Sequence, residues 1–276
     1  MAITAADVNK LRQMTGSGMM DCKNALVEAE GDFEKAIDIL RKKGQKIAAK
    51  RADRNANEGF VVAKTNSDNT FGIVLMVNCE TDFVGKTADF TGYANALAEL
   101  AIAKHITSKE ELLSADFNGQ TVEASLTEMS GKTGEKVEMN GFASLEKPFV
   151  NAYNHMGNRL AVIVGFNKGG ENIAQTAHEI AMQIAAMNPL GVTEKEIPQE
   201  IIDRELEVAR EQVRNEGKPE NMVEKIAQGK LNKFFKENTL LHQEFIRDTK
   251  MNVAEYMQKA DKELVCEGFF RIQLGA

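Results

Sequence analysis

The chain has 276 residues and a formal net charge of −7, and 43% of its residues are hydrophobic and 27% are charged. This length and composition suit two or three modest globular domains and exclude a disordered chain. The acidic balance disfavours nucleic-acid binding, because such an interface needs Lys and Arg to neutralise phosphates. No apolar stretch approaches the ~20 residues that a membrane-spanning helix requires, so we expect no membrane association.

Two further features of the composition favour a cytoplasmic protein. The start of the chain, MAIT, has neither the basic residues nor the apolar centre of a signal peptide. Cys22, Cys79 and Cys266 are odd in number, widely spaced and without a CxxC pair. We therefore expect reduced thiols rather than disulfides or a zinc site.

Residues 4–43 have the pattern of three short helices. Thr4 can cap the first helix together with Asp7, TGSG at residues 15–18 breaks the chain, and Asp32 can cap the third helix. Apolar residues spaced three and four apart are expected to face inward: Val8, Leu11, Cys22, Leu26, Ala29, Phe33, Ala36, Ile37 and Leu40. We predict a helical domain over residues 1–54 that is able to dock on a partner. The basic run at residues 41–54 is more typical of a solvated helix and linker than of a nucleic-acid patch.

The pattern changes from residue 58 onward to strands followed by a helix, twice over. Residues 59–65 and 71–79 are rich in strand formers around a polar hairpin turn, and residues 93–105 have a helical pattern. Residues 148–156 and 159–167 repeat the strand pair, and residues 171–187 repeat the helix. We predict an α+β core of two related parts, residues 55–140 and 141–276, although residues 114–140 show little pattern.

A helical hairpin is predicted within residues 192–240. Apolar residues at helical spacing lie on both sides of the reversal NEGKP at residues 215–219, namely Ile202, Leu206, Ala209 and Val213 before it and Val223, Ala227, Leu231 and Phe234 after it. Each arm would be roughly 27 Å long at 1.5 Å per residue. Residues 263–276 then read as a closing strand that pairs with the second sheet.

The motifs that would indicate an enzyme fail on inspection. GKT occurs at residues 85–87 and 131–133, but a phosphate-binding loop needs a glycine five positions earlier, where this chain has Glu80 and Leu126. The four histidines lack a metal-site spacing such as HExxH, and GxSxG is absent. We therefore expect no catalytic residues, no cofactor and no bound metal.

The most informative stretch is VNCETDFVGKTADF at residues 77–90, where a strand-like run ends and Asp82 stands beside Phe83. One interpretation is structural: Phe83 and Val84 pack inward while Asp82 caps the next helix. The other is that the pair is exposed for recognition of a partner. TDFV taken alone favours the structural interpretation.

Longer motifs reverse that preference. LRQMTGSGMMDCKNALVEAEGDFEKAI near the N-terminus, together with VNCETDFVGKTADF, closely resembles bacterial elongation factor Ts, the nucleotide-exchange factor family for elongation factor Tu. The resemblance continues through YNHMGNRLAVIVGF, HEIAMQIAAMNP, the segment around GKPE, and HQEF. It implies an α+β fold in which an N-terminal three-helix ubiquitin-associated-like domain precedes a two-part α+β core with an antiparallel coiled-coil helical hairpin. Some relatives carry a further helical module after the last strand, and contacts that depend on it stay open here.

The resemblance also implies the sites of contact with elongation factor Tu. The family's TDFV element intrudes beside the partner's nucleotide site and disturbs its magnesium coordination, and it corresponds to Thr81, Asp82, Phe83 and Val84. Further contacts are implied for Arg12, Met19 and Met20 with the nucleotide-binding domain, for His155 with another part of the partner, and for Phe245 and Ile246 as a hydrophobic contact. Arg247 departs from the apolar residue expected after them.

The two adjacent methionines invite a separate prediction. Met19 and Met20 follow a Gly-Ser-Gly turn, and adjacent residues cannot both face the core of one helix. Methionine also makes adaptable contact surfaces. We therefore expect one of the two to pack in the core and the other to anchor a partner.

The function implied is guanine-nucleotide exchange without bond-making or bond-breaking chemistry. The factor would bind GDP-bound elongation factor Tu, promote GDP release by stabilising the nucleotide-free state, and leave when GTP enters. An alternative from another class is a ubiquitin-associated-like adaptor whose coiled hairpin mediates assembly. A measurement of GDP release from elongation factor Tu separates the two. The sequence leaves open whether the chain forms a homodimer, its affinity and exchange rate, and what the hairpin does.

Overall fold

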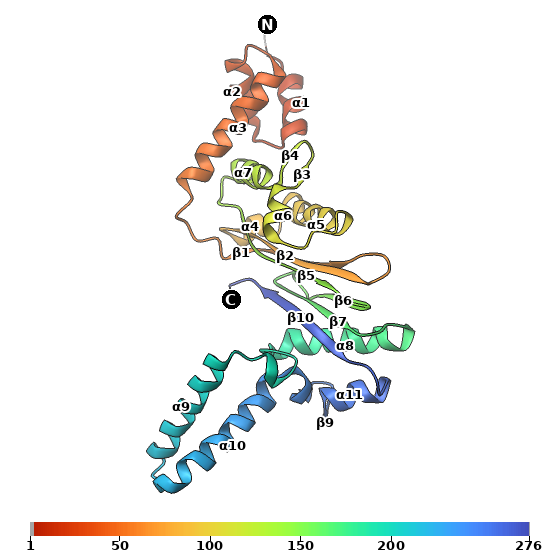
Figure 1. Ribbon diagram of the computed structural model, residues 1–276. Helices are drawn as coiled ribbons and strands as arrows, with labels where there is room; N and C mark the ends of the chain where they lie inside the picture. Colours follow the sequence, from red (N-terminus) through yellow and green to blue (C-terminus); the bar gives the residue numbers. More distant parts are fainter. Residues whose placement is uncertain (1–2, 276) are drawn as a thin grey trace.

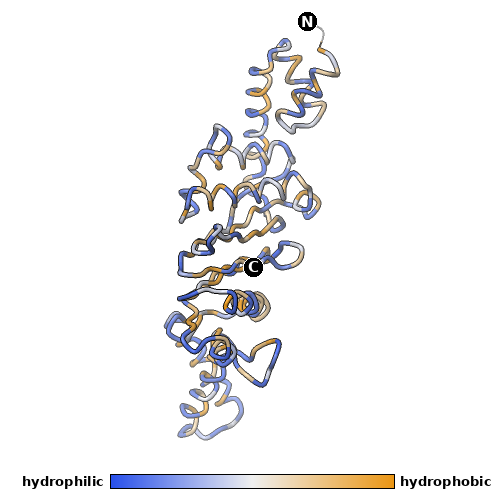
Figure 2. The backbone as a smooth tube through the Cα atoms, turned by 90° about the vertical axis from the view of Figure 1, so that its right-hand side faces the viewer, coloured by the Kyte–Doolittle hydropathy of each residue, from blue (hydrophilic) through white to orange (hydrophobic). Residues whose placement is uncertain are grey.

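The computed structural model describes residues 3–275. Met1 and Ala2, which begin the MAIT segment of the predicted first domain, lie outside the described residues. So does Ala276, at the end of the predicted last domain. The described residues form a stack of layers with a helical unit at each end (Figure 1). Figure 2 shows the same stack from the side.

Three helices form the N-terminal unit: α1 (Ala5–Thr15), α2 (Met19–Glu28) and α3 (Phe33–Lys50). The predicted caps are confirmed, because Thr4 and Asp7 form a capping box and the Asp32 side chain accepts from the Lys35 backbone N–H. The unit has a small core of its own, made of Val8, Leu11, Cys22, Ala25, Leu26, Ala29 and Ala36. The predicted end of the third helix at residue 43 is too early, since most of the basic run is helical.

The first sheet has the order β1-β2-β5 and is antiparallel throughout. The predicted hairpin is confirmed as β1 (Glu58–Thr65) and β2 (Phe71–Cys79), whereas β5 (Glu138–Glu146) was not predicted. The boundary predicted between residues 140 and 141 falls inside β5, which pairs with β2 along its whole length. This strand lacks a clear alternation of hydrophobic and polar residues, because it contains polar and small residues such as Asn140, Gly141 and Ser144.

One face of the first sheet is covered by helices. These are α4 (Asp82–Gly85), α5 (Ala88–Ala103), α6 (Lys109–Ser114) and α7 (Val122–Thr133), with a small hairpin of β3 (Asp116–Phe117) and β4 (Gln120–Thr121) between the last two. Their buried side chains, which include Phe90, Leu97, Leu112 and Leu126, share one core with Phe71, Ile73 and Leu75 of β2. The weakly patterned segment 114–140 therefore contains an ordered helix and strands.

The second sheet has the order β10-β7-β6 and is also antiparallel. The predicted strand pair is confirmed as β6 (Phe149–Asn154) and β7 (Leu160–Phe166), and the predicted closing strand is confirmed as β10 (Cys266–Gln273). Helix α8 (Glu171–Met187) covers this sheet, with α11 (Val253–Ala260) and the short strands β8 (Glu244–Phe245) and β9 (Asp248–Asn252) beside it.

The inner faces of the two sheets pack against each other. Val61, Ala63 and Val74 of the first sheet meet Val150, Ala161 and Ile163 of the second in one buried cluster. The core is thus four layers deep, helices on sheet on sheet on helix (Figure 1). This stacking places the turns of one sheet beside the strand ends of the other.

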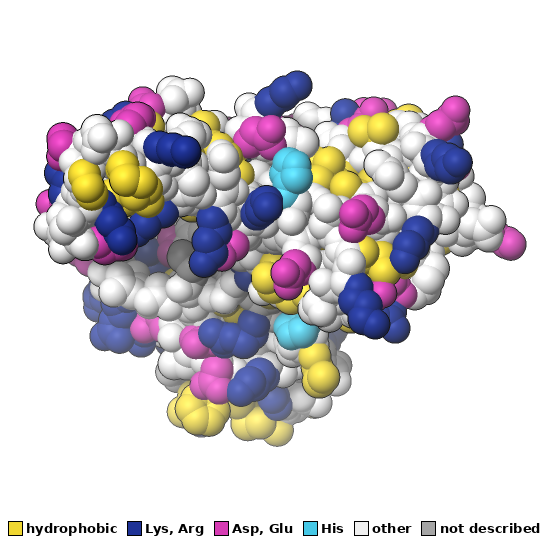
Figure 3. All heavy atoms as spheres, turned by 90° about the horizontal axis from the view of Figure 1, so that it is seen from below, with side chains coloured by type: hydrophobic (Ala, Val, Ile, Leu, Met, Phe, Trp, Pro, Cys, Tyr) yellow, Lys and Arg dark blue, Asp and Glu magenta, His cyan; other side chains and the backbone are white. Residues whose placement is uncertain are grey.

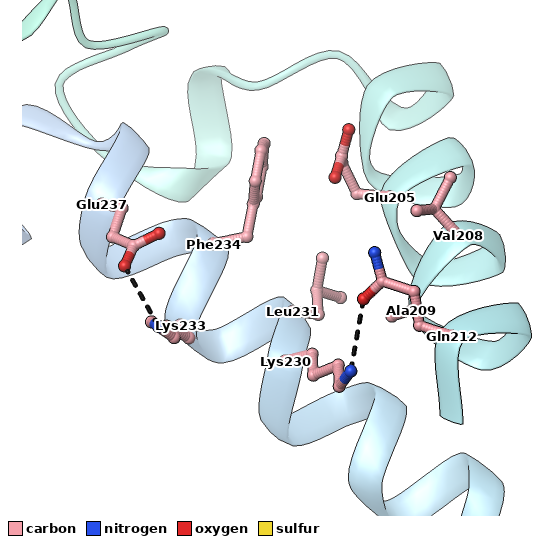
Figure 4. Close-up of a pocket in the computed structure, with 9 residues that line it drawn as sticks. All are labelled: Glu205, Val208, Ala209, Gln212, Lys230, Leu231, Lys233, Phe234 and Glu237. Atoms are coloured by element: carbon pink, nitrogen blue, oxygen red, sulfur yellow. Dashed lines mark hydrogen bonds and ion pairs between the residues drawn. The ribbon is translucent and has the colours of Figure 1, made fainter. Parts of the chain in front are cut away.

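The predicted antiparallel hairpin is confirmed as α9 (Gln199–Asn215) and α10 (Glu220–Asn238), which project from the core (Figure 1). Short 3-10 helices, η1 (Glu194–Glu196) and η2 (Leu240–His242), flank the two arms. Val213, Val223, Ala227 and Leu231 are buried between the arms. An open groove lies between the arms nearer the core, and Val208, Leu231 and Phe234 are among the residues that line it (Figure 4).

Within residues 3–275, every helix is too short or too polar to span a lipid bilayer. Among the same residues, no group of His, Cys, Asp and Glu side chains has the arrangement of a metal site. Acidic and basic side chains are interspersed over the face seen in Figure 3, where neither sign forms a continuous patch.

Candidate partner-binding site

The turn after β2 shows which side chains of TDFV pack inward and which are exposed. Each of the two interpretations holds for some of these residues. Phe83 is 83% exposed, so its ring does not pack inward. Val84 does pack against the core of the first sheet. Thr81, rather than Asp82, caps α4, because its side chain accepts from the Val84 N–H. The short helix therefore turns its valine toward the core and its phenylalanine toward solvent.

The backbone of α4 lies directly on the start of β1. Gly85 is buried, and a Cβ added there would approach the carbonyl oxygen of Gly59 at 3.1 Å. Gly59 has a φ of 144°, and a Cβ on it would lie 2.1 Å from the carbonyl oxygen of Val77. Only glycine fits this double approach without displacing the backbone. This backbone contact fixes the distance between α4 and β1.

The buried thiol of Cys79 adds a contact beneath the same turn. Its Sγ donates to the Thr81 carbonyl oxygen at 3.1 Å. Burial, together with the nearby negative charge of Glu135, raises the pKa of Cys79 to about 12. The residue is therefore a neutral thiol at physiological pH, where it can donate this hydrogen bond.

The carboxylate of Glu80 ties the turn to the segment that follows α3. It accepts from the Arg51 guanidinium at 2.7 Å, from Arg54 at 3.2 Å and from the Lys136 backbone N–H at 2.7 Å. Burial alone would raise the pKa of Glu80, but these donors outweigh it and hold the pKa below its ordinary value. Glu80 is thus a charged anchor at the base of the site.

Asp82 is partly exposed and paired within the helix. Its carboxylate lies 2.6 Å from the Lys86 ammonium group, one turn along. The hydrogen bond from Lys86, together with the charge of that lysine, lowers the pKa of Asp82. Asp82 therefore presents a negative charge at the surface beside the exposed ring of Phe83.

The turn between β6 and β7, which carries His155, reaches the same edge of the core. Val61 of β1 donates its N–H to the carbonyl oxygen of Asn158 at 2.8 Å, and the Arg159 guanidinium pairs with Glu58. The pKa of Arg159 is raised chiefly by the hydrogen bond that its guanidinium donates to Glu58, with a smaller contribution from the charge of Asp82. The stacked sheets thus bring this turn close to α4, although 70 or more residues of chain separate them.

His155 and Met156 form the exposed part of this turn. His155 is exposed, and its Nδ1 lies 3.0 Å from the Tyr153 hydroxyl group. Met156 is 90% exposed, more than any other large hydrophobic residue of residues 3–275. We did not predict a role for Met156, although a methionine directly before a Gly-Asn turn is a signal that was available. Phe83 and Met156 are two apolar side chains in solvent at one edge of the molecule.

The predicted contacts of the N-terminal unit lie on its surface. Arg12 is exposed, and Met19 and Met20 are 58% and 63% exposed. The prediction that one methionine packs in the core is wrong, because α2 begins at Met19 and its inward positions start only with Cys22. Both methionines instead line an open hollow together with Ile3 and Val8.

The predicted hydrophobic contact at Phe245 and Ile246 needs a correction. Phe245 is only 2% exposed, and its ring stacks on that of Tyr256 with 4.0 Å between the ring centroids. It belongs to the core under α8 and presents no surface. Ile246 is 38% exposed, and the neighbouring Arg247 pairs with Glu179 of α8. Only Ile246 of the two stays a candidate contact.

The predicted contact residues therefore occupy three places along the stack. His155 joins residues 81–84 at one edge of the core, while Arg12, Met19 and Met20 lie on the N-terminal helices and Ile246 lies near α8. A surface spread over three elements suits a large protein partner better than a small ligand.

Comparison with known proteins identifies the family. The family model described as "Elongation factor TS" matches residues 80–276. Elongation factor Ts of Christiangramia forsetii is 54% identical over 99% of both chains, and that of Flavobacterium psychrophilum is 50% identical over 99% of both. The protein of the same name from Amoebophilus asiaticus is 47% identical over the full length of both chains. The chain belongs to the elongation factor Ts family.

Family membership confirms the resemblance seen in the sequence motifs. It makes this chain an elongation factor of protein biosynthesis and agrees with its mixed helix-and-sheet architecture. The matched region begins at Glu80, the anchor residue directly before Thr81. The relatives extend the similarity over the N-terminal helices as well.

Proposed function

We propose that this chain is the guanine-nucleotide exchange factor of elongation factor Tu, acting in the cytoplasm without bond-making or bond-breaking chemistry. It would bind the GDP-bound partner, insert the turn at residues 81–84 near the nucleotide and its magnesium ion, and hold the nucleotide-free state. Incoming GTP would then release it. The observation that carries the proposal is the 83% exposure of Phe83 on a backbone that Glu135 holds at Thr81 and that lies against Gly59 at Gly85.

The physical task is release of a tightly bound ligand. A nucleotide held at nanomolar affinity is bound by about 12 kcal/mol, so its unaided dissociation is slow. A factor accelerates dissociation when it binds the open, empty partner better than the loaded one. Reciprocity then requires that nucleotide weakens the binding of the factor by the same ratio. Such a cycle needs no cofactor and no metal ion in the factor itself.

Phe83 and Asp82 would divide the work at the partner's nucleotide site. Burial of the ring in the partner is worth roughly 1.5–3 kcal/mol, which is available only once the site opens. The carboxylate of Asp82 would compete for the groups that surround the magnesium ion. To do so, it must first break its ion pair with Lys86. Thr81 and Val84 would serve as the cap and the inward anchor of the same element.

The remaining contacts would fix the orientation of the partner. We propose that Arg12, Met19 and Met20 bind its nucleotide-binding domain, that His155 contacts another part of it, and that Ile246 adds a hydrophobic contact. On this proposal residues 1–54 are a ubiquitin-associated-like docking domain and the hairpin is a coiled coil. The separate core of the N-terminal helices and the buried stripe between α9 and α10 support this description.

The test compares Phe83→Ala with a matched variant. Phe83→Ala should slow release of a fluorescent GDP analogue from elongation factor Tu by roughly 10- to 100-fold, which corresponds to the loss of the buried ring. Asp82→Ala should slow release less, because charge near solvent is screened. Phe270→Ala, at a phenylalanine that is 43% exposed on β10, should exchange like the wild type.

Denaturant melts decide whether Phe83 acts in the partner or in this fold. The Phe83→Ala variant should lose no more than about 1 kcal/mol of unfolding free energy, whereas removal of a core phenylalanine costs ~3–5 kcal/mol. A wild-type chain that fails to accelerate GDP release would remove the proposal and favour an adaptor role. A Phe83→Ala variant that melts like a core mutant yet exchanges like the wild type would show that no wedge exists.

A further inference from the structure

The turn that carries Phe83 cannot hold its shape unaided. Helix α4 contains four residues, a single turn, and an isolated turn of helix is unstable in water. The Phe83 ring is 83% exposed, so contacts of the ring contribute little to its own position. Its position is therefore set by the backbone of residues 81–85 and by whatever holds that backbone.

The carboxylate of Glu135 holds the beginning of this turn by three hydrogen bonds. Its Oε2 accepts the backbone N–H groups of Glu80 and Thr81, at 3.1 and 3.0 Å. Its Oε1 accepts the hydroxyl proton of Thr81 at 2.6 Å. Hydrogen bonds to an ionised acceptor are about twice as strong as neutral ones, so one side chain fixes two consecutive residues.

The third of these hydrogen bonds also sets the cap of α4. A hydroxyl group has one proton, and when Thr81 gives that proton to Glu135 its lone pairs are left to face the helix. The Val84 N–H donates to this oxygen at 3.4 Å. Glu135, the Thr81 hydroxyl and the Val84 amide thus form a chain that ends one residue after Phe83.

Glu135 lies in a short loop that is closed by hydrogen bonds at both ends. Helix α7 ends at Thr133, and Gly134 follows in the left-handed conformation with a φ of 71°. The buried Ser130 hydroxyl group accepts the Val137 N–H at 2.9 Å and so closes the loop from the other side. The carboxylate is therefore carried by the helical layer of the core, 54 residues further along the chain than Thr81.

We infer that Glu135 is a positioning residue for nucleotide exchange: it holds Thr81 and the first turn of α4 so that the Phe83 ring is presented in one orientation. The inference rests on the proposed function. Glu135 touches neither nucleotide nor partner in this role, and its effect passes through the turn that carries Asp82 and Phe83, chiefly through the Phe83 ring. A ring whose backbone is fixed before binding loses less conformational entropy when it enters the partner.

The test is a double-mutant cycle on the rate of GDP release from elongation factor Tu, with the partner–GDP complex treated as the substrate. Glu135→Ala should lower the maximal rate by about fivefold, the size expected for loss of a helix cap. The concentration giving half of that rate should change by less than about twofold, since the other contacts are intact. Thr81→Val, which replaces the hydroxyl group with a methyl group of similar size, should reproduce most of the loss, and Thr81→Ser, which keeps the hydroxyl group, should retain the wild-type rate.

Three comparisons separate positioning from a general loss of structure. In the Phe83→Ala background, Glu135→Ala should cause much less slowing than in the wild type, because the ring is gone and only Asp82 is left to place. Hydrogen exchange of the Val84 amide should be faster in the Glu135→Ala protein than in the wild type. Glu128→Ala is the matched control, because the Glu128 carboxylate on α7 accepts a hydrogen bond from Gln120 rather than from Glu80 or Thr81. It should leave the rate of GDP release and the exchange of the Val84 amide unchanged.

The outcomes distinguish this inference from the function on which it rests. A wild-type rate no faster than spontaneous release defeats the proposed function itself. A slow Phe83→Ala protein beside a fast Glu135→Ala protein leaves the function intact and overturns the inference. Equal slowing by Glu135→Ala in the wild-type and Phe83→Ala backgrounds also overturns it, since the effect would then not pass through the ring. If Glu135→Ala does not fold, the double-mutant cycle is measured with Thr81→Val and Phe83→Ala instead, and the same outcomes decide it.

Discussion

The N-terminal helices and the α9–α10 hairpin are both helical extensions of the core, but they are attached in opposite ways. Helix α3 lies along α7 with glycine against glycine, and a Cβ on Gly131 would lie 2.4 Å from the Cα of Gly44. The hairpin instead joins the core at its base, where Leu190 donates its N–H to the Asn238 carbonyl oxygen and Leu240 donates to Gly191. One extension is docked along its side, whereas the other projects (Figure 1).

The mode of attachment decides whether each extension has a fixed orientation relative to the core. The N-terminal unit is held by the α3–α7 contact and by the ion pairs of Glu80 with Arg51 and Arg54, so its orientation is linked to the turn that carries Phe83. The contacts proposed for Arg12 and Phe83 are thus on surfaces that are oriented relative to each other before any partner binds. The hairpin buries its apolar residues between its own arms, and its opening need not disturb the layered core.

The largest effect is expected from a truncation in the hairpin, and it should stay local. Leu231→Ala removes a side chain that is 4% exposed between the arms, which costs about 2–5 kcal/mol of local stability. Hydrogen exchange should rise throughout α9 and α10, while the main thermal transition stays in place. Leu126→Ala in α7, at a leucine 6% exposed, is the matched control and should lower the main transition. Loss of the main transition in the Leu231 variant would show that the hairpin is as firmly coupled as the N-terminal unit.

A smaller effect is expected where α3 meets α7. Gly131→Ala places a methyl group against the backbone of Gly44, and overpacking of this kind costs about 1–3 kcal/mol. Gly229→Ala in α10 is the matched control, because nothing lies within 4 Å of its added Cβ, and it should stabilise the hairpin by about 0.5–1 kcal/mol. Gly131→Ala should lower the midpoint of the main denaturant melt, whereas Gly229→Ala should leave that midpoint in place and slow hydrogen exchange in α9 and α10. A neutral Gly131→Ala variant would contradict the close side-by-side docking.

The smallest effect concerns the pH dependence of the Glu80 anchor. Its pKa is lowered in the folded protein, so its contribution to stability is fully present above the ordinary pKa of glutamate, ~4.3, and is lost as the pH falls through the folded value. Glu80→Gln should cost about 1 kcal/mol at neutral pH, because the amide keeps the shape and one acceptor oxygen but loses the charge that faces Arg51 and Arg54. The difference in stability between the two proteins should shrink as the pH is lowered from 6 to 3, roughly the range of carboxylate titration. A difference that stays constant over this range would mean that the charge of Glu80 does not contribute.

Local patterns predicted the regular elements well where the signal was strong. The capping pair Thr4 and Asp7, the strand-forming runs of β2 and β7, and the reversal before α10 were all found from neighbouring residues alone. Strand β5 and helix α7 were missed because their sequences mix polar, small and apolar residues. Their stability comes from contacts with β2 and α3, which no local pattern contains.

The candidate site shows the same division. TDFV alone did not predict the exposure of Phe83, since a phenylalanine in a one-turn helix can face either way. The resemblance of the longer motifs did predict it, and the structure confirms it. Phe245 was predicted to be a contact and is buried, whereas Met156 was overlooked and is the most exposed large apolar residue of the described chain. Exposure depends on which elements pack above each residue.

The sequence by itself determined the family, the helical and strand-forming segments with clear periodicity, and the motif that carries the proposed function. Those features depend on residues within a few positions of one another, whose spacing is set by the geometry of a helix or strand. Only the tertiary structure decided that Glu135 braces Thr81, that Asn158 meets Val61, and that α3 lies on α7. These contacts join residues more than 50 positions apart, and they exist because the two sheets stack and the helices cover them.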